Sequence, residues 1–431
     1  MRKEVPRFAT VSSDARDEVA QIKSRRRIAL YSWLIVAVVV GSTLLGAVMP
    51  KSAVGTKENG TDMTAFYAAG MIVRDGRGVD LYDSDVQFEY EQPYLDEEAK
   101  ALPFSYPPHV AVLFVPLTFV PFQVALLLHG VLMVLAMAVA LKLMQPMVPV
   151  VRRHYALSLS FVLWFVPFTM SIGMGQNIGL TFLLLTWIWR SLTDGDQRST
   201  GIAVTLMMFK PQFAVPISGL LLVGRHYRAV GVAALGTSLI GVLNIFIFSL
   251  SWPVRWFGTF SDFTSANEFT ETVRFVVSPT GFLRAVLGTD SSVAPVAGMV
   301  VIVAVASVMT WLWRQPGASI DLLMAATAPA IILTSLHSMA FSPTLLLVTA
   351  AVVAGRGRLS WPLVLAIHVS GWIVISLLPL GFNLAAPATL VTFVISAVIA
   401  QRSIAGPSPD AADVDESVFT DPSSTTSPAF L

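Results

Sequence analysis

The repetition of long apolar segments is the strongest constraint on what this chain can fold into. Apolar runs of about 18 to 23 residues recur along it, and an α-helix of that length can cross the hydrocarbon core of a membrane. Of the 431 residues, 55% are hydrophobic and 13% are charged, whereas roughly a quarter are charged in soluble globular proteins. The sequence therefore predicts an all-α polytopic membrane protein.

Composition argues against several other classes of protein. The formal net charge is +1 with no basic stripe, which disfavours nucleic-acid binding. Cysteine is absent, and the six histidines show no metal-ligand spacing, so we expect neither a metal site nor another cofactor. Asp80, Asp83 and Asp85 lack the spacing of a calcium-binding loop, and we interpret them as a solvated face.

Basic residues beside the apolar runs predict the orientation in the membrane. Arg25 to Arg27 precede the first run, 28–49, and the positive-inside rule then places the tail 1–27 in the cytoplasm. The loop 50–108 is consequently extracytoplasmic, and it holds eleven acidic residues against five basic ones. Such an acidic loop suits the outer face of a plasma membrane.

The same rule predicts about twelve helices between residues 28 and 402, with both termini cytoplasmic. The piece 108–120 is too short to span and is expected to be re-entrant or interfacial. We expect an outer loop over 251–292 and a disordered tail, rich in Ser, Pro, Asp and Thr, over 403–431. The spans expected after the long loop are 122–144, 155–173, 178–189, 201–209 with 212–223, 229–249, 293–313, 320–336, 341–354, 359–378 and 385–400.

Three polar insertions interrupt this pattern, all at the predicted outer face. Asp62 precedes apolar residues that recur at helical spacing from Met63 to Val73, and we expect a short surface helix there, capped by Thr61 or Asp62. The second insertion is Gly175-Gln176-Asn177, which is either a plain turn cap or functional. The third is Lys210-Pro211-Gln212, inside an otherwise apolar run.

Lys210 is costly to place in a membrane and therefore informative. A lysine at the centre of a span costs roughly 2.5 to 3.5 kcal/mol on insertion scales. It either snorkels to the surface or lines a cavity, where it meets an anion. Two later residues are weaker candidates: His337 either packs or contacts substrate, and Arg284 either meets a lipid phosphate or is a surface charge.

A series of short motifs carries a family resemblance. In chain order they are Asp62 with Phe66-Tyr67, Gly78 to Asp83, Tyr106-Pro107-Pro108, Gly175 to Asn177, Phe209 to Gln212 and Ser278 to Arg284. Together they resemble glycosyltransferase family 87, the bacterial polyprenyl-phosphate-mannose-dependent α-mannosyltransferases of the GT-C fold. The resemblance covers about residues 28–402. Where many members carry Ser-Pro followed by a Tyr-Asp pair, this chain reads Thr334-Ser335-Leu336-His337-Ser338.

The resemblance implies a GT-C-like bundle that moves a sugar, mannose in the family, with inversion. The donor would be a polyprenyl phosphate, and the acceptor a lipid-linked or cell-envelope glycan on the extracytoplasmic side. One carboxylate suffices, because a polyprenyl phosphate leaves without the proton that a glycosidase must supply. We therefore predict Asp62 as the general base. The residues expected to bind donor phosphate and substrate are Lys210, Gln176, Asn177, Gln212, Tyr106, Arg284 and His337.

Two other functions fit a chain of this composition. A transporter or lipid flippase of about twelve helices would favour two similar halves around a site at the bilayer midplane. No such repeat is visible, and the largest hydrophilic insertion follows the first predicted helix instead. A scaffold subunit with an inactive site is the third reading.

Overall fold

A computed structural model of the protein describes residues 27, 30–38, 41–42, 61–95, 102–265, 275–288, 290–356, 361–377 and 384–405. Within these ranges the regular elements are helices, and the only β-structure is an isolated bridge between Val276 and Met339. Residues 30–38 of the first predicted span are helical. Half of that run, the tail 1–26 and the tail beyond residue 405 lie outside the described residues. The all-α prediction is confirmed for the part of the chain that the structure describes.

Several described helices have the length and composition of membrane spans. Four are individually long and apolar enough to cross a membrane, and a pair of helices bent by 63° at its break would be a fifth if the two form one span. Those elements are α5 (Phe122–Met144), α12 (Tyr227–Phe248), α16 (Val293–Arg314), α20 (Ala385–Ala405), and the bent pair α7 (Tyr155–Leu163) with α8 (Val166–Gly173). The shorter helices are α6 (Pro149–Arg153), α9 (Ile178–Thr193), α10 (Gln197–Met207), α11 (Pro211–Val223), α17 (Ile320–Thr334), η6 (Ser342–Leu345), α18 (Leu346–Ala354) and α19 (Trp361–Leu377). The total of about twelve spans stays a prediction.

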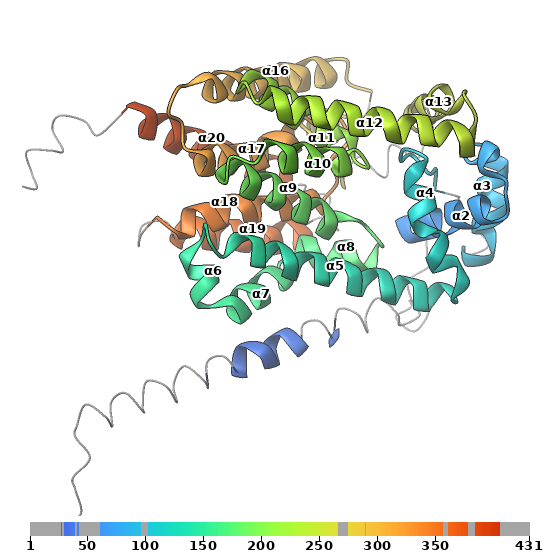
Figure 1. Cartoon of the computed structure of the whole chain (residues 1–431), viewed down its shortest axis with the longest axis horizontal. Helices are drawn as coiled ribbons and strands as arrows, with labels where there is room; N and C mark the ends of the chain where they lie inside the picture. Colours follow the sequence, from blue (N-terminus) through green and yellow to red (C-terminus); the bar gives the residue numbers. More distant parts are fainter. Residues whose placement is uncertain are drawn as a thin grey trace, which may run out of the picture.

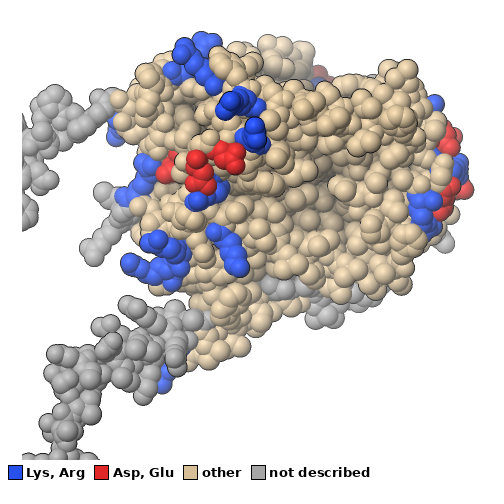
Figure 2. Space-filling view, viewed as in Figure 1, with Lys and Arg blue, Asp and Glu red and all other residues tan. Residues whose placement is uncertain are grey.

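The helices form one bundle (Figure 1). On the face that Figure 2 shows, Lys and Arg gather at one end together with a few acidic residues, and a second group of acidic and basic residues lies at the other end. The surface between them is almost entirely uncharged. Arg152 and Arg153 end α6, and Arg190 lies in the last turn of α9, as the positive-inside rule expects of one face. An uncharged band between charged ends suits a protein that spans a membrane.

Residues 61–95 and 102–119 fold into a helical cap at one end of the bundle. Its elements are α2 (Asp62–Arg74), η2 (Gly78–Asp80), α3 (Ser84–Glu91), η3 (Gln92–Tyr94), α4 (His109–Phe114) and η4 (Val115–Phe119). The prediction of a surface helix was wrong for α2, because every residue from Met63 to Gly70 is buried against protein. Gly70 allows this burial, since a Cβ there would lie 3.0 Å from the backbone of Phe114 in α4.

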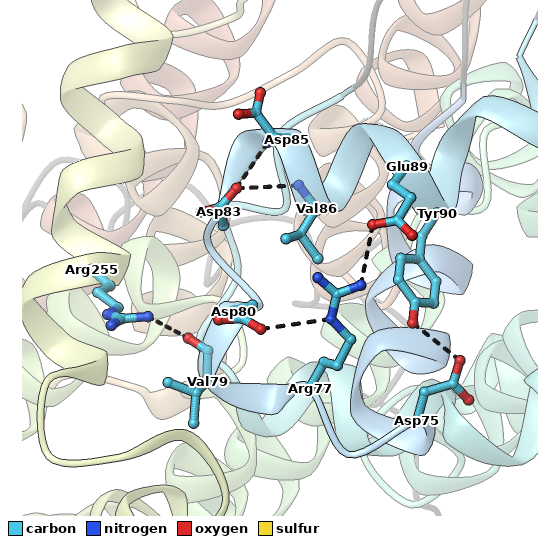
Figure 3. A network of polar contacts seen from close by, with 10 residues as sticks. All are labelled: Asp75, Arg77, Val79, Asp80, Asp83, Asp85, Val86, Glu89, Tyr90 and Arg255. Carbon is cyan, nitrogen blue, oxygen red and sulfur yellow. Dashed lines mark hydrogen bonds and ion pairs between the residues drawn. The ribbon is translucent and has the colours of Figure 1, made fainter.

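Acidic residues at the surface of the cap form ion pairs and cap a helix (Figure 3). The Arg77 guanidinium pairs with Asp80 at 3.6 Å and with Glu89 at 3.1 Å. The Asp83 carboxylate caps α3 by accepting the backbone N–H groups of Asp85 and Val86. These side chains therefore fit the predicted solvated face.

The segment 251–292, predicted as an outer loop, contains helices in the part that the structure describes, and its place outside the membrane stays a prediction. α13 (Trp252–Ser265) and α15 (Pro279–Leu287) are short and amphipathic, so they lack the long apolar run that marks a span. α13 rests on the cap: Arg255 donates to the Val79 carbonyl, and Trp256 Nε1 donates to the Ser105 carbonyl at 2.9 Å. These contacts join residues that are 176 and 151 positions apart in the chain.

Two buried side chains of α3 hold the segment that leads to Tyr106. Gln87 and Glu91 are one helical turn apart and are 4% and 0% exposed. Gln87 Oε1 accepts the Phe104 N–H at 3.0 Å, and Glu91 Oε2 accepts the Leu102 N–H at 2.8 Å. Side chains four residues apart on a helix thus fix two alternate N–H groups of the neighbouring segment. These two hydrogen bonds hold the segment that precedes Tyr106 and thereby help to position it.

A second close contact joins the cap to the bundle at the turn between α8 and α9. The Met63 N–H of α2 donates to the Met174 carbonyl at 3.0 Å. The next residue, Gly175, has φ +75°, and a Cβ on it would lie 2.3 Å from Met63 Cβ. Only glycine fits both the backbone conformation and the space. This contact holds the first helical turn of α2 against the chain segment that connects α8 and α9.

We predict that Gly175→Ala destabilises the protein more than Gly195→Ala does. Both glycines have positive φ, which costs roughly 1 to 2 kcal/mol for an L-residue. A Cβ at Gly195 meets nothing within 4 Å, whereas one at Gly175 collides with Met63. Thermal unfolding of the two purified variants in detergent measures the difference. Equal losses in melting temperature would contradict the tight contact.

We predict that Glu91 makes stability depend on pH. Burial raises the pKa of its carboxyl from 4.5 to about 8. The folded protein then keeps a proton that the unfolded chain releases between these values, so this contribution to stability is full below about pH 4.5 and is lost as pH rises through about 8. The melting temperature should fall between about pH 5 and pH 8 in the unmodified protein and fall less in Glu91→Gln. Identical slopes would contradict this role.

Candidate active site

Asp62 is the first residue of α2 and lies where the cap meets the bundle. The helix is capped by Thr61, whose N–H donates to Thr64 Oγ1 at 3.4 Å, so the Asp62 carboxylate is not the cap. Asp62 is half-buried, in contrast to the exposed acids elsewhere in the cap. Its position in the first helical turn favours the charged form through the helix dipole. The carboxylate is therefore placed for contacts outside its own helix.

Gln176 connects three parts of the chain at this point. Its Oε1 accepts the Tyr106 hydroxyl at 3.1 Å and the Lys210 ammonium at 3.2 Å. An ammonium can only donate, so the carboxamide oxygen must face Lys210 and the amide nitrogen is left for Asp62. Gln176 forms that hydrogen bond to the Asp62 carboxylate. The side chain is 3% exposed, and it bridges the carboxylate and the ammonium.

Lys210 is buried and does not snorkel to the surface. It caps α11 after α10 has ended, so the predicted break in this apolar run is present. The side chain is 2% exposed. Its Nζ lies 5.3 Å from the ring centroid of Phe341 and 5.9 Å from those of Phe209 and Tyr106. Aromatic faces and one amide offset only part of the desolvation of an ammonium, which favours a nearby anion.

The electrostatics of the site make Asp62 a stronger base than an exposed aspartate. Burial raises the pKa of the Asp62 carboxyl, while the Gln176 hydrogen bond and the Lys210 charge lower it. Burial is the largest of these effects. A carboxyl with a raised pKa binds a proton more strongly, which is what a general base requires.

The structure also brings His337 close to Lys210. His337 follows α17, and its side chain is exposed, yet it is near enough for the Lys210 charge to act on it. The Val276–Met339 bridge and the Val277 N–H to Ser338 carbonyl bond tie this loop to the segment that begins α15. Arg284 lies in the last turn of α15, and half-buried Gln212 lies in the first turn of α11. Their contacts with a substrate stay predictions.

Asn177 has a partner that the sequence reading missed. It occupies the N-cap position of α9 without a capping bond from its side chain. Its Oδ1 lies 3.0 Å from Nε2 of His129, a buried residue of α5. The available signal was an imidazole within an otherwise apolar span, since ionisable residues there are rare. Phe209 and Phe341 carried no comparable signal, because aromatic residues are common in apolar runs.

Comparison with known proteins identifies the family. A sequence model described as glycosyltransferase family 87 matches residues 104–343, more than half of the chain. The match includes Tyr106, Gln176, Lys210 and His337, whereas Asp62 precedes it. A search of curated proteins found no match. The predicted enzyme class is confirmed by the family match: the protein is a glycosyltransferase, and it belongs to glycosyltransferase family 87.

Proposed function

We propose that this enzyme transfers mannose from a polyprenyl-phosphate donor to a lipid-linked or cell-envelope glycan acceptor, with Asp62 as the general base. The reaction would take place on the extracytoplasmic side of the plasma membrane, with both termini cytoplasmic. The observation that carries the proposal is the half-buried Asp62 carboxylate joined through Gln176 to the buried Lys210 ammonium. This arrangement holds a base and a cation at one end of an apolar bundle.

The chemistry is a single displacement at the anomeric carbon of the donor sugar. The acceptor hydroxyl oxygen attacks that carbon while its proton passes to the Asp62 carboxylate. The bond from the anomeric carbon to the phosphate oxygen breaks, and its electron pair leaves with polyprenyl phosphate. Attack opposite the leaving group inverts the configuration, so a β-linked donor gives an α-linked product. No second acid is needed, because the phosphate is a good leaving group.

Lys210 is the candidate for stabilising the negative charge that builds on the phosphate. Its ammonium has three N–H donors, and the Gln176 carboxamide accepts one of them. The charge of Lys210 reaches Asp62 on one side and His337 on the other. A phosphate between Lys210 and His337 would therefore lie near the base. The remaining proposed substrate contacts are Tyr106, Asn177, Gln212 and Arg284.

The decisive test of this proposal is Asp62→Asn. The amide keeps the size of the side chain but cannot accept the acceptor's proton, so the transfer rate should fall by at least about two orders of magnitude. The assay supplies purified enzyme in detergent with radiolabelled polyprenyl-phosphate sugars and a lipid extract. Asp80→Asn is the matched control: Asp80 is half-buried and paired with Arg77, so this variant should retain the transfer rate.

Near-normal transfer by Asp62→Asn would remove the proposed base. Movement of the lipid donor across reconstituted vesicles without sugar transfer would instead favour a flippase. If the enzyme transfers no mannose but transfers another sugar from its polyprenyl-phosphate donor, the proposed donor sugar is wrong and the proposed mechanism still holds.

We predict that Lys210→Met lowers turnover and raises the apparent KM for the lipid donor. Methionine keeps much of the buried volume while removing the charge, so a loss of about tenfold or more in kcat/KM would reflect the phosphate interaction. Lys142→Met, at an exposed position in the last turn of α5, is the control. Unchanged kinetics in the Lys210 variant would show that its ammonium serves packing only.

A further inference from the structure

We propose that His129 is a positioning residue for the transfer reaction: it fixes the Gly175-Gln176-Asn177 turn so that Gln176 bridges Asp62 and Lys210. The proposal deepens the proposed function and rests on it for its kinetic consequence. Its geometric basis is the 3.0 Å contact between His129 Nε2 and Asn177 Oδ1. Because a carboxamide oxygen only accepts, Nε2 carries the proton of this hydrogen bond.

The pair leaves two polar atoms unsatisfied, which is unusual for a contact that serves stability alone. His129 is 2% exposed and Asn177 is 5% exposed. Among the described residues, neither His129 Nδ1 nor Asn177 Nδ2 has a hydrogen-bond partner. Leaving a buried polar atom without a partner destabilises the folded state, and an apolar pair of similar shape would avoid that cost. A role in positioning the neighbouring Gln176 explains why the polar pair is retained despite this cost.

The packing of α5 on α9 does not itself require a histidine. Gly179, half a turn beyond Asn177, lies so close to α5 that a Cβ there would meet the Met133 carbonyl oxygen at 2.7 Å. Met133 is one turn beyond His129. The two backbones are therefore in direct contact beside the pair, and the His129 hydrogen bond adds orientation of the turn to a packing that exists without it.

A closed chain of contacts links His129 back to Gln176 through the cap. Its ring stacks on Phe114 with centroids 5.6 Å apart, and Phe114 stacks on Phe66 at 4.6 Å. Phe66 meets the Tyr106 ring edge-on at 4.8 Å, and the Tyr106 hydroxyl donates to Gln176. The turn is thus held from the bundle by His129 and from the cap by Tyr106. Aromatic contacts of this kind add to the stability of the packing beyond the apolar area that they bury.

The test compares His129→Phe with His129→Gln. Phenylalanine keeps the stacking on Phe114 and loses the donor, whereas glutamine can still donate to Asn177 Oδ1. His368→Phe is the matched control, because His368 also stacks on a phenylalanine, Phe161, in another part of the bundle.

The first readout is an infrared titration of the protonated Asp62 carboxyl in lipid nanodiscs, with the band identified by its absence in Asp62→Asn. Losing the Gln176 hydrogen bond removes an interaction that lowers the pKa of Asp62. We expect the pKa of Asp62 to rise in His129→Phe and to stay unchanged in His129→Gln and His368→Phe. The second readout is kcat, which should fall about tenfold in His129→Phe, with its acid limb moved to higher pH.

An unchanged Asp62 titration in His129→Phe would overturn the positioning role. If that variant fails to fold, Asn177→Ala decides, because removing the acceptor must raise the pKa of Asp62 in the same way. The titration does not depend on catalysis. A shifted titration together with normal transfer by Asp62→Asn would keep the positioning role and reject Asp62 as the base, so the two proposals can fail separately.

Discussion

Lys210 is an ammonium group inside a bundle of apolar helices, and withdrawing such a group from water costs several kcal/mol unless other groups compensate. Compensation comes from the Gln176 carboxamide, from three aromatic rings and from the Asp62 charge. Each of these groups arrives on a different segment of the chain. The fold can therefore accommodate the buried Lys210 ammonium only because it brings those segments together.

Glycine makes that assembly possible at two contacts. Gly70 lets α4 pack directly on α2, and Gly175 lets the turn before α9 touch the first turn of α2. The same packing that buries α2 sets Asp62 beside Gln176. Burial then changes the chemistry of the carboxyl, because desolvation favours its protonated form. The exposed acids of the cap keep their roles in ion pairs and helix capping.

The candidate site combines residues inside the segment that the family model matches with one residue that precedes it. The segment 104–343 carries the family match and supplies Tyr106, Gln176, Lys210 and His337. The proposed base precedes that segment, on α2 of the cap. The first turn of α2 packs on the turn between α8 and α9. The Asp62 carboxylate comes from the cap and the Lys210 ammonium from the bundle, and Gln176 bridges the two. Such an arrangement suits transfer at a membrane boundary better than transport through the bundle.

The sequence alone determined the class of fold and most helix positions. The prediction 122–144 coincides with α5, and 293–313 nearly coincides with α16, because a span needs a long apolar run and such runs are visible locally. Amphipathic α13 and α15 were missed, since a short helix that is apolar on one side resembles a loop in average hydrophobicity. The polar insertions at Asp62, Gln176 and Lys210 were visible for the same local reason.

Only the tertiary structure decided how those residues meet. The amphipathic pattern of α2 fits a membrane surface and a protein interior equally well, and burial under α4 selected the interior. The sequence likewise left open whether Lys210 reaches the surface and whether Asn177 merely caps a helix. His129 and Asn177 are 48 residues apart, and no local pattern relates them. Apolar runs are determined by neighbouring residues and can be read in order, whereas a hydrogen bond between distant side chains exists only after the helices have packed.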